Sequence, residues 1–258
     1  MRFICKNCNQ QFKGNYCNNC GQTADTHEIN RHYLWHTIQH GVFHVDNGII
    51  YTTKELFTRP GYAIKEYITG KRVKHFNPFA YVIILSTLYV LIAHFLHIDL
   101  FDKKISVTLS GDEGTKVTEI IGVITGISTW IKDHYAYSTL MLLPVFSLAS
   151  YLAFKKSGYN YLKHLILNTY IAGQRTVIYI LFIPIFACTE NKDLISAIGN
   201  IEYLVWIVLM TWTYIQFFNN NKGFENILRT LLSFLYTGIL MFLLMVFTGI
   251  LLAIMIAK

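Results

Sequence analysis

Charged side chains are scarce in this chain of 258 residues, of which only 14% are Asp, Glu, Lys or Arg, whereas soluble proteins average about 25%. The deficit is uneven, because residues 1–77 hold 15 of the 37 charged residues. Most of the others lie in short segments between long apolar runs. This distribution excludes an ordinary soluble domain and is typical of a polytopic membrane protein. The 17 Tyr, 18 Phe and 4 Trp residues agree with that class, since aromatic rings are favoured at membrane–water interfaces.

Five apolar runs have the length of a transmembrane helix, which takes roughly 20 residues to cross a hydrocarbon core about 30 Å thick. Buried helices of a soluble core are an alternative, but five such runs would leave too little amphipathic surface to cover them. The sequence therefore predicts an all-α membrane protein, with juxtamembrane amphipathic helices over residues 25–77 and a five-span transmembrane helix bundle over residues 78–258. The predicted spans are residues 78–98, 138–154, 170–188, 203–218 and 231–257.

The orientation follows from the Lys and Arg residues of the short loops. The chain begins with a polar, cysteine-rich segment and lacks the basic start, apolar stretch and cleavage site of a signal peptide. Residues 1–77 carry ten Lys and Arg against five acids, whereas residues 99–137 carry four against six acids. The basic loops all fall on one side, which predicts a cytoplasmic N-terminus and an external C-terminus. The net charge of +7 is spread over juxtamembrane loops, which argues against nucleic-acid binding.

Four cysteines form the most specific motif of the chain. Cys5, Cys8, Cys17 and Cys20 have the spacing C-x2-C-x8-C-x2-C, and Gly21 follows the second pair directly. Tetrahedral Zn²⁺ prefers thiolate ligands at about 2.3 Å, and two C-x-x-C turns joined by a hairpin supply four of them. The spacing predicts a zinc ribbon over residues 1–24 that depends on structural Zn²⁺ for its folding.

Two other interpretations of the cysteines stay open. A pair of disulfides is disfavoured because the predicted topology places the segment on the reducing side of the membrane. Iron in a rubredoxin-like site would use the same four ligands. With either metal the protein fills all four positions, which leaves no place for a substrate and argues against catalysis there.

Four histidines recur at every fourth position, and on a helix they form one stripe opposite an apolar stripe. Histidines at i and i+4 can hold a transition metal, but the glutamate of an H-E-x-x-H site is missing from the segment HYLWH. The stripe is a candidate for a second metal site, for a face that becomes cationic below about pH 6.5, or for an ordinary solvated face. The four residues are His32, His36, His40 and His44.

Cations and amphipathic segments flank the first predicted span. Thr52 and Glu55 have the spacing of a helix-capping box. On the external side, residues 117–131 have the spacing of a helix that lies in the membrane interface or caps the bundle. Cations next to an anionic leaflet contribute about 1 kcal/mol each. The candidates for lipid headgroup contact are Lys65, Lys71, Arg72 and Lys74.

Three stretches of residues 1–80 carry a family resemblance: CKNCNQQFKGNYCNNCGQ, FHVDNGIIYTTKELFTRPG and YITGKRVKHFNP. They resemble a bacterial domain-of-unknown-function family of multi-pass inner-membrane proteins with an N-terminal four-cysteine zinc ribbon. The resemblance implies a cytoplasmic ribbon and a bundle in the bacterial inner membrane, and it implies no established activity. The matching positions are Gly48, Thr53, Pro60, Gly61, Tyr67, Gly70, Lys71, Arg72 and Pro78.

Ionisable residues within the predicted spans are few, so the spans themselves indicate no mechanism. Arg175 is expected about one turn inside the third span, where its side chain can extend to the cytoplasmic headgroups. The leading hypothesis is a non-enzymatic scaffold, or a signalling or envelope-assembly protein, that contacts membrane lipids and docks a protein partner through residues 1–77; a homo-oligomer is compatible with it. The second hypothesis is a small-solute or ion transporter or channel component. The third is an enzyme that acts on lipid through a histidine-bound metal.

Overall fold

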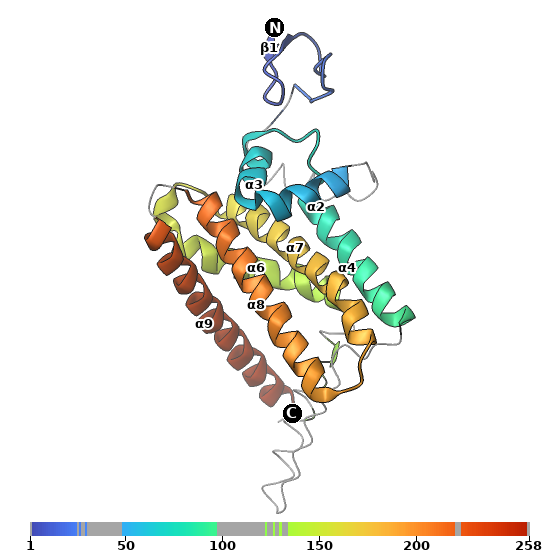
Figure 1. The fold of residues 1–258 in the computed structure, drawn as a ribbon. Helices are drawn as coiled ribbons and strands as arrows, with labels where there is room; N and C mark the ends of the chain where they lie inside the picture. Colours follow the sequence, from blue (N-terminus) through green and yellow to red (C-terminus); the bar gives the residue numbers. More distant parts are fainter. Residues whose placement is uncertain are drawn as a thin grey trace, which may run out of the picture.

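The computed structural model describes residues 2–24, 26, 29, 48–96, 122, 126, 129–130, 134–219 and 223–256, with the side chains of the last helix described as far as residue 249. This part of the chain is mostly helical, and it carries one small antiparallel sheet close to the N-terminus (Figure 1). The described N-terminus and the C-terminal helix end lie at opposite ends of the molecule.

Five long helices form the bundle (Figure 1). Each is long and apolar enough to cross a membrane, so the described residues contain the predicted number of candidate spans. A single turn of 3₁₀ helix, η1 (Lys155–Ser157), separates the second long helix from the third. The five helices are α4 (Pro78–Phe95), α6 (Tyr135–Ala153), α7 (Tyr161–Ala187), α8 (Lys192–Phe217) and α9 (Gly223–Ile256).

Three helices begin well before the predicted spans. α7, α8 and α9 start at residues 161, 192 and 223, whereas the predicted spans start at residues 170, 203 and 231. The apolar runs stop at polar or charged residues, but a polar or charged side chain does not interrupt the backbone hydrogen bonds of a helix. Asparagines cap two of these starts, as is common at helix N-termini: Asn160 accepts from the N–H of Lys163 and Asn191 from that of Asp193, both at 2.9 Å.

Two short helices lie across one end of the bundle (Figure 1). α2 (Gly48–Thr58) and α3 (Pro60–Thr69) meet at Arg59, and α3 packs against α8. Gly61 permits this approach, because a Cβ atom there would overlap the chain of α8 at Gln216 and Phe217. We call residues 48–77 the cap, since they close this end of the bundle.

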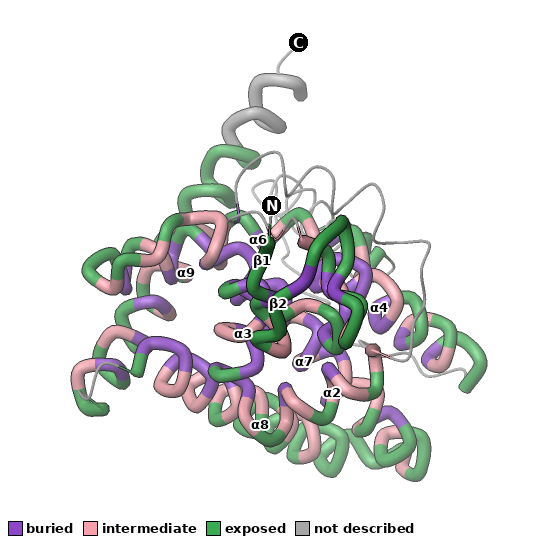
Figure 2. The backbone as a smooth tube through the Cα atoms, turned by 90° about the horizontal axis from the view of Figure 1, so that it is seen from above, coloured by how far each residue is buried: buried purple, intermediate pink, exposed green. Residues whose placement is uncertain are grey.

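The core of the bundle centres on the contact between α4 and α7. Gly173 lies against the ring of Tyr81, which fills the space that a side chain would need, and both Tyr81 and Tyr170 are fully buried. Buried residues gather on the inner sides of the helices, and exposed residues cover the outer sides (Figure 2). The outer face of α9 exposes Phe242 and Phe247 among other apolar side chains, a surface of the kind that marks contact with a membrane or a partner.

A set of polar side chains joins α6, α7 and α8 inside the bundle. Ser150 Oγ lies 3.0 Å from His164 Nδ1 and accepts a hydrogen bond from Asn168 Nδ2 at 2.8 Å. The hydroxyl of Tyr214 donates to Asn168 Oδ1 at 2.9 Å. These hydrogen bonds pair most of the polar atoms of the set, as is usual for buried polar groups, whereas His164 Nε2 has no partner among the described residues.

Candidate metal centre and the cap that carries it

Two similar turns build the cysteine site. In each turn the first cysteine pairs through its backbone with the residue five positions later: the N–H of Cys5 donates to the carbonyl of Gln10 at 2.9 Å, and that of Cys17 to the carbonyl of Gln22 at 2.8 Å. The residue after the second cysteine has a positive φ in both turns, +61° at Asn9 and +74° at Gly21. Glycine and asparagine adopt this conformation most readily, so the local sequence explains both turns.

The four sulfur atoms converge on one point. Cys5 Sγ lies 3.5 Å from Cys20 Sγ, and Cys8 Sγ lies 3.5 Å from Cys17 Sγ, while all four atoms lie within 4.8 Å of one another. Thiolates at about 2.3 Å from a tetrahedral metal are separated by about 3.8 Å, which matches this spacing. A disulfide requires about 2.05 Å, and all four cysteines are free. The predicted ligand residues are therefore brought together in a geometry that could hold a metal ion.

The surroundings of the sulfur atoms favour a thiolate at two of the four positions. A hydrogen bond from the backbone of Gln10 lowers the pKa of the Cys8 thiol to about 6, and a hydrogen bond from the Asn7 side chain lowers the pKa of Cys20. Burial raises the pKa of Cys5 to about 11. A cation placed among the four sulfurs would favour the thiolate at every position, because metal ligands must be deprotonated.

Very little apolar surface supports the ribbon. The strands β1 (Phe3–Ile4) and β2 (Gln11–Phe12) pair with Phe3 opposite Phe12. Phe12 is buried against Cys5 and Cys17, whereas Phe3 is partly exposed and Tyr16 is 62% exposed. Phe12 is therefore the one fully buried aromatic side chain among these three, and the apolar packing around the cysteines is small.

The ribbon is attached to the end of α3. Gly70 ends α3 with φ of +107°, and its missing side chain leaves room for the side chains of Lys6 and Thr26. The Lys6 ammonium donates to the carbonyl of Thr26 at 3.0 Å, and the N–H of Arg72 donates to Gln22 Oε1 at 3.2 Å. The metal-site turn that contains Gln22 is therefore bonded directly to the cap.

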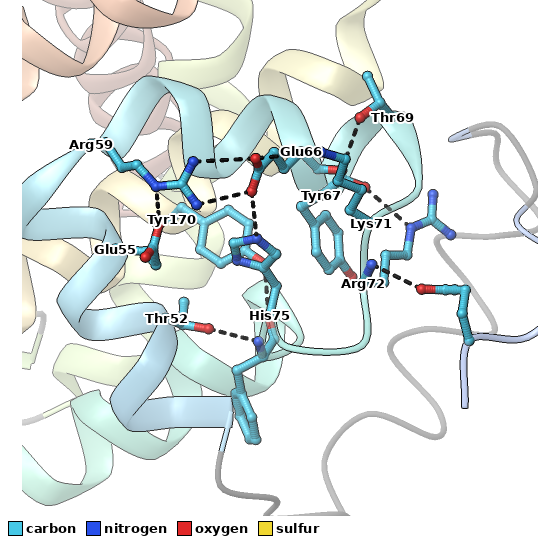
Figure 3. Close-up of polar contacts among 12 residues, drawn as sticks. Thr52, Glu55, Arg59, Glu66, Tyr67, Thr69, Lys71, Arg72, His75 and Tyr170 are labelled. Carbon is cyan, nitrogen blue, oxygen red and sulfur yellow. Dashed lines mark hydrogen bonds and ion pairs between the residues drawn. The ribbon is translucent and has the colours of Figure 1, made fainter. Parts of the chain in front are cut away.

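A network of charges centred on Glu66 stiffens the cap (Figure 3). Arg59 donates to both carboxylate oxygens of Glu66 at 3.2 Å and also pairs with Glu55. Lys71 lies 3.6 Å and His75 3.5 Å from the same carboxylate. Burial opposes ionisation of Glu66, but the hydrogen bonds and charges of Arg59 and Lys71 lower its pKa overall. The cap thus holds a partly buried carboxylate in its charged form.

Backbone and tyrosine contacts fasten the cap to the bundle. The N–H of Phe76 donates to Thr52 Oγ1 at 2.7 Å, and the hydroxyl of Tyr170 in α7 donates to the carbonyl of Phe76 at 2.6 Å. Gln174 Nε2 donates to the carbonyl of Leu56 at 2.6 Å. Thr52 lies inside α2, which begins at Gly48, so the capping-box interpretation of Thr52 and Glu55 is wrong: Thr52 holds the turn before α4 in place.

The four cations predicted to contact lipid headgroups all lie in the cap. Lys71 pairs with Glu66, and Arg72 and Lys74 lie over the rings of Tyr67 and Tyr51 at 5.5 and 5.9 Å. Lys65 lies over the ring of Phe217 at 5.9 Å, and burial lowers its pKa. These contacts assign the cations a structural role, and their contact with lipid stays a prediction.

Other predicted sites fall largely outside the described part of the chain. His32, His36, His40 and His44 all lie outside it, so the histidine stripe stays a prediction. Within residues 117–131 the structure describes only four residues, all helical, and the choice between an interfacial helix and a cap stays open. The four are Gly122, Gly126, Thr129 and Trp130.

The described residues contain five helices with the length and apolarity of membrane spans and an N-terminal cluster of four cysteines. These features are those of a multi-pass helical protein. Within the chain, residues 46–90 match the family described as "Protein of unknown function (DUF3667)". No curated protein and no solved structure matches the chain. The matched segment starts after the ribbon and extends to the middle of α4, so it is shifted from the resemblance over residues 1–80.

The positions that carried the resemblance have structural roles in the matched segment. Gly61 and Gly70 make the close approaches to α8 and to the ribbon. Thr53 Oγ1 lies 2.9 Å from the hydroxyl of Tyr81, and Tyr67 packs edge-on against Tyr170. The segment that matches the family of unknown function therefore corresponds to the cap and to the part of α4 that follows it.

Reasoning from the sequence missed two groups of residues. The Glu66 network was not anticipated, although the spacing of Glu55 and Arg59 on one helical turn is a local signal for part of it. The second group surrounds Arg175, which lies near the middle of α7 because that helix begins at Tyr161. Its guanidinium lies over the rings of Tyr179 and Trp206 and does not extend to the end of the helix, contrary to the prediction.

Proposed function

We propose that this chain is a multi-pass protein of the bacterial inner membrane whose N-terminal ribbon holds structural Zn²⁺ in the cytoplasm and docks a protein partner there. The observation that carries the proposal is a closed four-cysteine site bonded to the cap. Because all four tetrahedral positions would be filled by Cys5, Cys8, Cys17 and Cys20, the metal supports the fold and has no open position for chemistry. The protein is a scaffold or a signalling or envelope-assembly component on this basis.

The distribution of charge supports the proposed orientation. Cations cluster at the end of the bundle that carries the ribbon and the cap, where Lys155 and Lys156 form η1 between α6 and α7. The turn between α7 and α8, which includes Glu190, and the first turn of α8, with Lys192 and Asp193, lie at the opposite end and carry two acids and one cation. Loops rich in Lys and Arg stay in the cytoplasm, which supports a cytoplasmic ribbon and an external C-terminus.

Exposed apolar residues on the ribbon support the docking role. Ile4 is 66% exposed and Tyr16 is 62% exposed, although they belong to a segment that the metal site holds rigid. The ribbon is bonded to the cap through Gln22 and Arg72. Exposed apolar groups on an anchored module are typical of a surface that a partner covers.

Metal analysis of the full chain, purified in a non-ionic detergent, tests the zinc site. We expect one Zn²⁺ per chain, its loss in Cys17→Ser, and an unchanged content in His36→Ala. Iron in place of zinc would overturn the choice of metal. Two metal ions per chain, one of which is lost in His36→Ala, would contradict the scaffold proposal. That result would favour the hypothesis of an enzyme that acts on lipid through a histidine-bound metal.

Photo-crosslinking in cells tests docking, with a photoreactive residue at Tyr16 of the full chain. Tyr62 on α3, which is 43% exposed, is the matched control. We expect a discrete protein adduct from Tyr16, none from Tyr62, and loss of the Tyr16 adduct when Cys17→Ser removes the metal. Adducts from both positions, or from neither, would contradict a partner site on the ribbon.

A small-solute transporter or channel component is the second candidate. The observation that favours it is a cavity of about 360 Å³ beside Arg175 between α6, α7 and α8. Flux measurements in liposomes that contain the purified chain test it. Flux that requires Arg175 would favour transport, and liposomes no leakier than protein-free controls would exclude it.

A further inference from the structure

The cavity between α6, α7 and α8 has two kinds of wall. Apolar side chains form most of its lining, among them Leu142, Phe146 and Met210. Ser138, Arg175 and Trp206 contribute polar groups to the same lining. Its volume of about 360 Å³ lies at the lower end of the range of small-molecule sites, roughly 300–1,000 Å³.

Hydrogen-bonding groups in this lining lack partners in the described part of the protein. They are Ser138 Oγ, Arg175 Nε and Trp206 Nε1, and each of these atoms is buried. Arginine and indole nitrogens only donate, and a serine hydroxyl can donate as well. A buried polar group without a partner costs about 1–3 kcal/mol, so three of them around one cavity indicate that a ligand rich in acceptor atoms belongs there.

The positive charge of Arg175 indicates that the ligand carries a negative charge. Its guanidinium lies 4.5 Å from the ring centre of Trp206 and 5.0 Å from that of Tyr179, contacts that offset only part of the cost of a charge in an apolar setting. Glu202, the acid whose charge acts on Arg175, lies one turn from Trp206 on α8. No ion pair joins Glu202 to Arg175 among the described residues, so Glu202 acts on the cation only from a distance and leaves its Nε–H without a partner.

We propose that this cavity binds a single-chain amphiphile with an anionic headgroup, either a carboxylate or a phosphate. Arg175 and Trp206 donate hydrogen bonds to the headgroup oxygens, and the acyl chain lies against Leu142, Phe146 and Met210. The small volume favours one chain over the paired chains of a phospholipid. The proposal rests on the membrane placement proposed above.

Fluorescence quenching tests the site directly, because Trp206 lies in its wall. The experiment uses the full chain in non-ionic micelles, with Trp35, Trp130 and Trp212 replaced by Phe so that Trp206 is the one remaining tryptophan. The protein is titrated with three probes: dibromostearate, a dibrominated lysophosphatidic acid, and the neutral methyl ester of dibromostearate. We expect saturable quenching by an anionic probe at concentrations at least about tenfold below those the ester needs, since charged hydrogen bonds are about twice as strong as neutral ones. The two anionic arms separate a carboxylate ligand from a phosphate ligand.

Three variants and one control make the assignment specific. Arg175→Gln should weaken anion binding about tenfold or more, Arg175→Lys should restore part of it, and Ala172→Phe should abolish it by filling the cavity without removing a charge. Lys163→Gln is the matched control, because Lys163 is a cation on the same helix that lies over the ring of Tyr159 at 5.8 Å and does not line the cavity. Equal quenching by acid and ester, or anion binding unchanged in Arg175→Gln, would overturn the proposal.

A separate experiment distinguishes a failure of the anion-site proposal from a failure of the proposed membrane placement. In vesicles of brominated phospholipid, membrane insertion quenches the tryptophans of the unmodified chain whether or not the cavity binds anions. Glu202→Gln tests the remaining alternative, an internal pair with Arg175. We expect this variant to bind the anion equally or more tightly, and weaker binding would overturn the assignment of Arg175 as the free cation.

Discussion

Two arginines of this chain lie in opposite electrostatic surroundings. Arg59 in the cap donates to Glu66 and pairs with Glu55, which raises its pKa. Arg175 in α7 has aromatic rings beside it and an Nε atom without a partner among the described residues. The cap uses its cation to fix the positions of its own helices, whereas the bundle leaves its cation directed at a cavity.

The two arginines differ in whether their donor groups have hydrogen-bond or ion-pair partners within the protein. This criterion distinguishes a structural network from a binding site. Buried polar groups of native proteins are nearly always paired, so a complete network indicates a structural role and an incomplete one indicates a missing ligand. The four cysteines are a comparable case, because four thiolates brought within 4.8 Å of one another would need a cation between them. The comparison can be tested by overpacking the contact between the cap and α8, by replacing each arginine with methionine, or by titrating the network.

The largest effect is expected at Gly61. Gly61→Ala would place a Cβ atom within the chain of α8 at Gln216 and Phe217 and should lower the free energy of unfolding by about 2–3 kcal/mol, as overpacking does. The measurement is unfolding in mixed detergent and dodecyl sulfate micelles. Gly199→Ala in α8 is the control, because nothing lies within 4 Å of that position, and it should be neutral or stabilising. Equal effects of the two changes would mean that the cap does not sit on α8.

The arginine comparison itself comes next. Arg59→Met should cost about 1–3 kcal/mol because it leaves Glu66 without its main partner, a range reduced for the 39% exposure of the Arg59 side chain. Arg175→Met should be neutral or stabilising in the ligand-free protein, since it removes a cation that forms no ion pair among the described residues. Thermal unfolding of both variants in the same detergent checks the contrast. A loss of stability as large in Arg175→Met as in Arg59→Met would show that Arg175 is structural as well.

The smallest effect concerns pH. Burial lowers the pKa of His75 below its ordinary value in spite of the nearby Glu66, so the folded state favours the neutral ring. Stability from this group is present above the unfolded pKa of about 6.5 and is lost as the pH falls below it. Glu66 stays ionised in that range because its pKa is lowered, so its own contribution is lost only below about pH 4.3. His75→Gln should flatten the stability profile between about pH 6.5 and 4.5, and an unchanged slope would assign it to other groups.

The sequence predicts the features that depend on local spacing. Apolar runs identify five candidate spans, and the two C-x-x-C turns identify the four cysteines that could hold a metal ion, since each turn is formed by neighbouring residues. Contacts between distant segments were not predictable from one sequence. Arg175 can be recognised as a charge within an apolar run, but nothing local indicates that Trp206 and Ser138 meet it at one cavity. The start of α7 was missed for a related reason, because hydropathy marks the lipid-facing part of a helix and not its backbone ends.

The contact of Gly61 with Gln216 also sets an order of events during synthesis. The N–H of Gly61 donates to a side chain 155 residues further along the chain, at 3.1 Å. At translation rates of about 5–20 residues per second, roughly 8–30 s pass between the synthesis of Gly61 and that of Gln216. The cap cannot pack against α8 before then. The ribbon, complete at residue 24, is made entirely before that moment. A metal ion bound by the four cysteines would therefore have time to fold the ribbon on the nascent chain, before α8 is made and the cap packs on it.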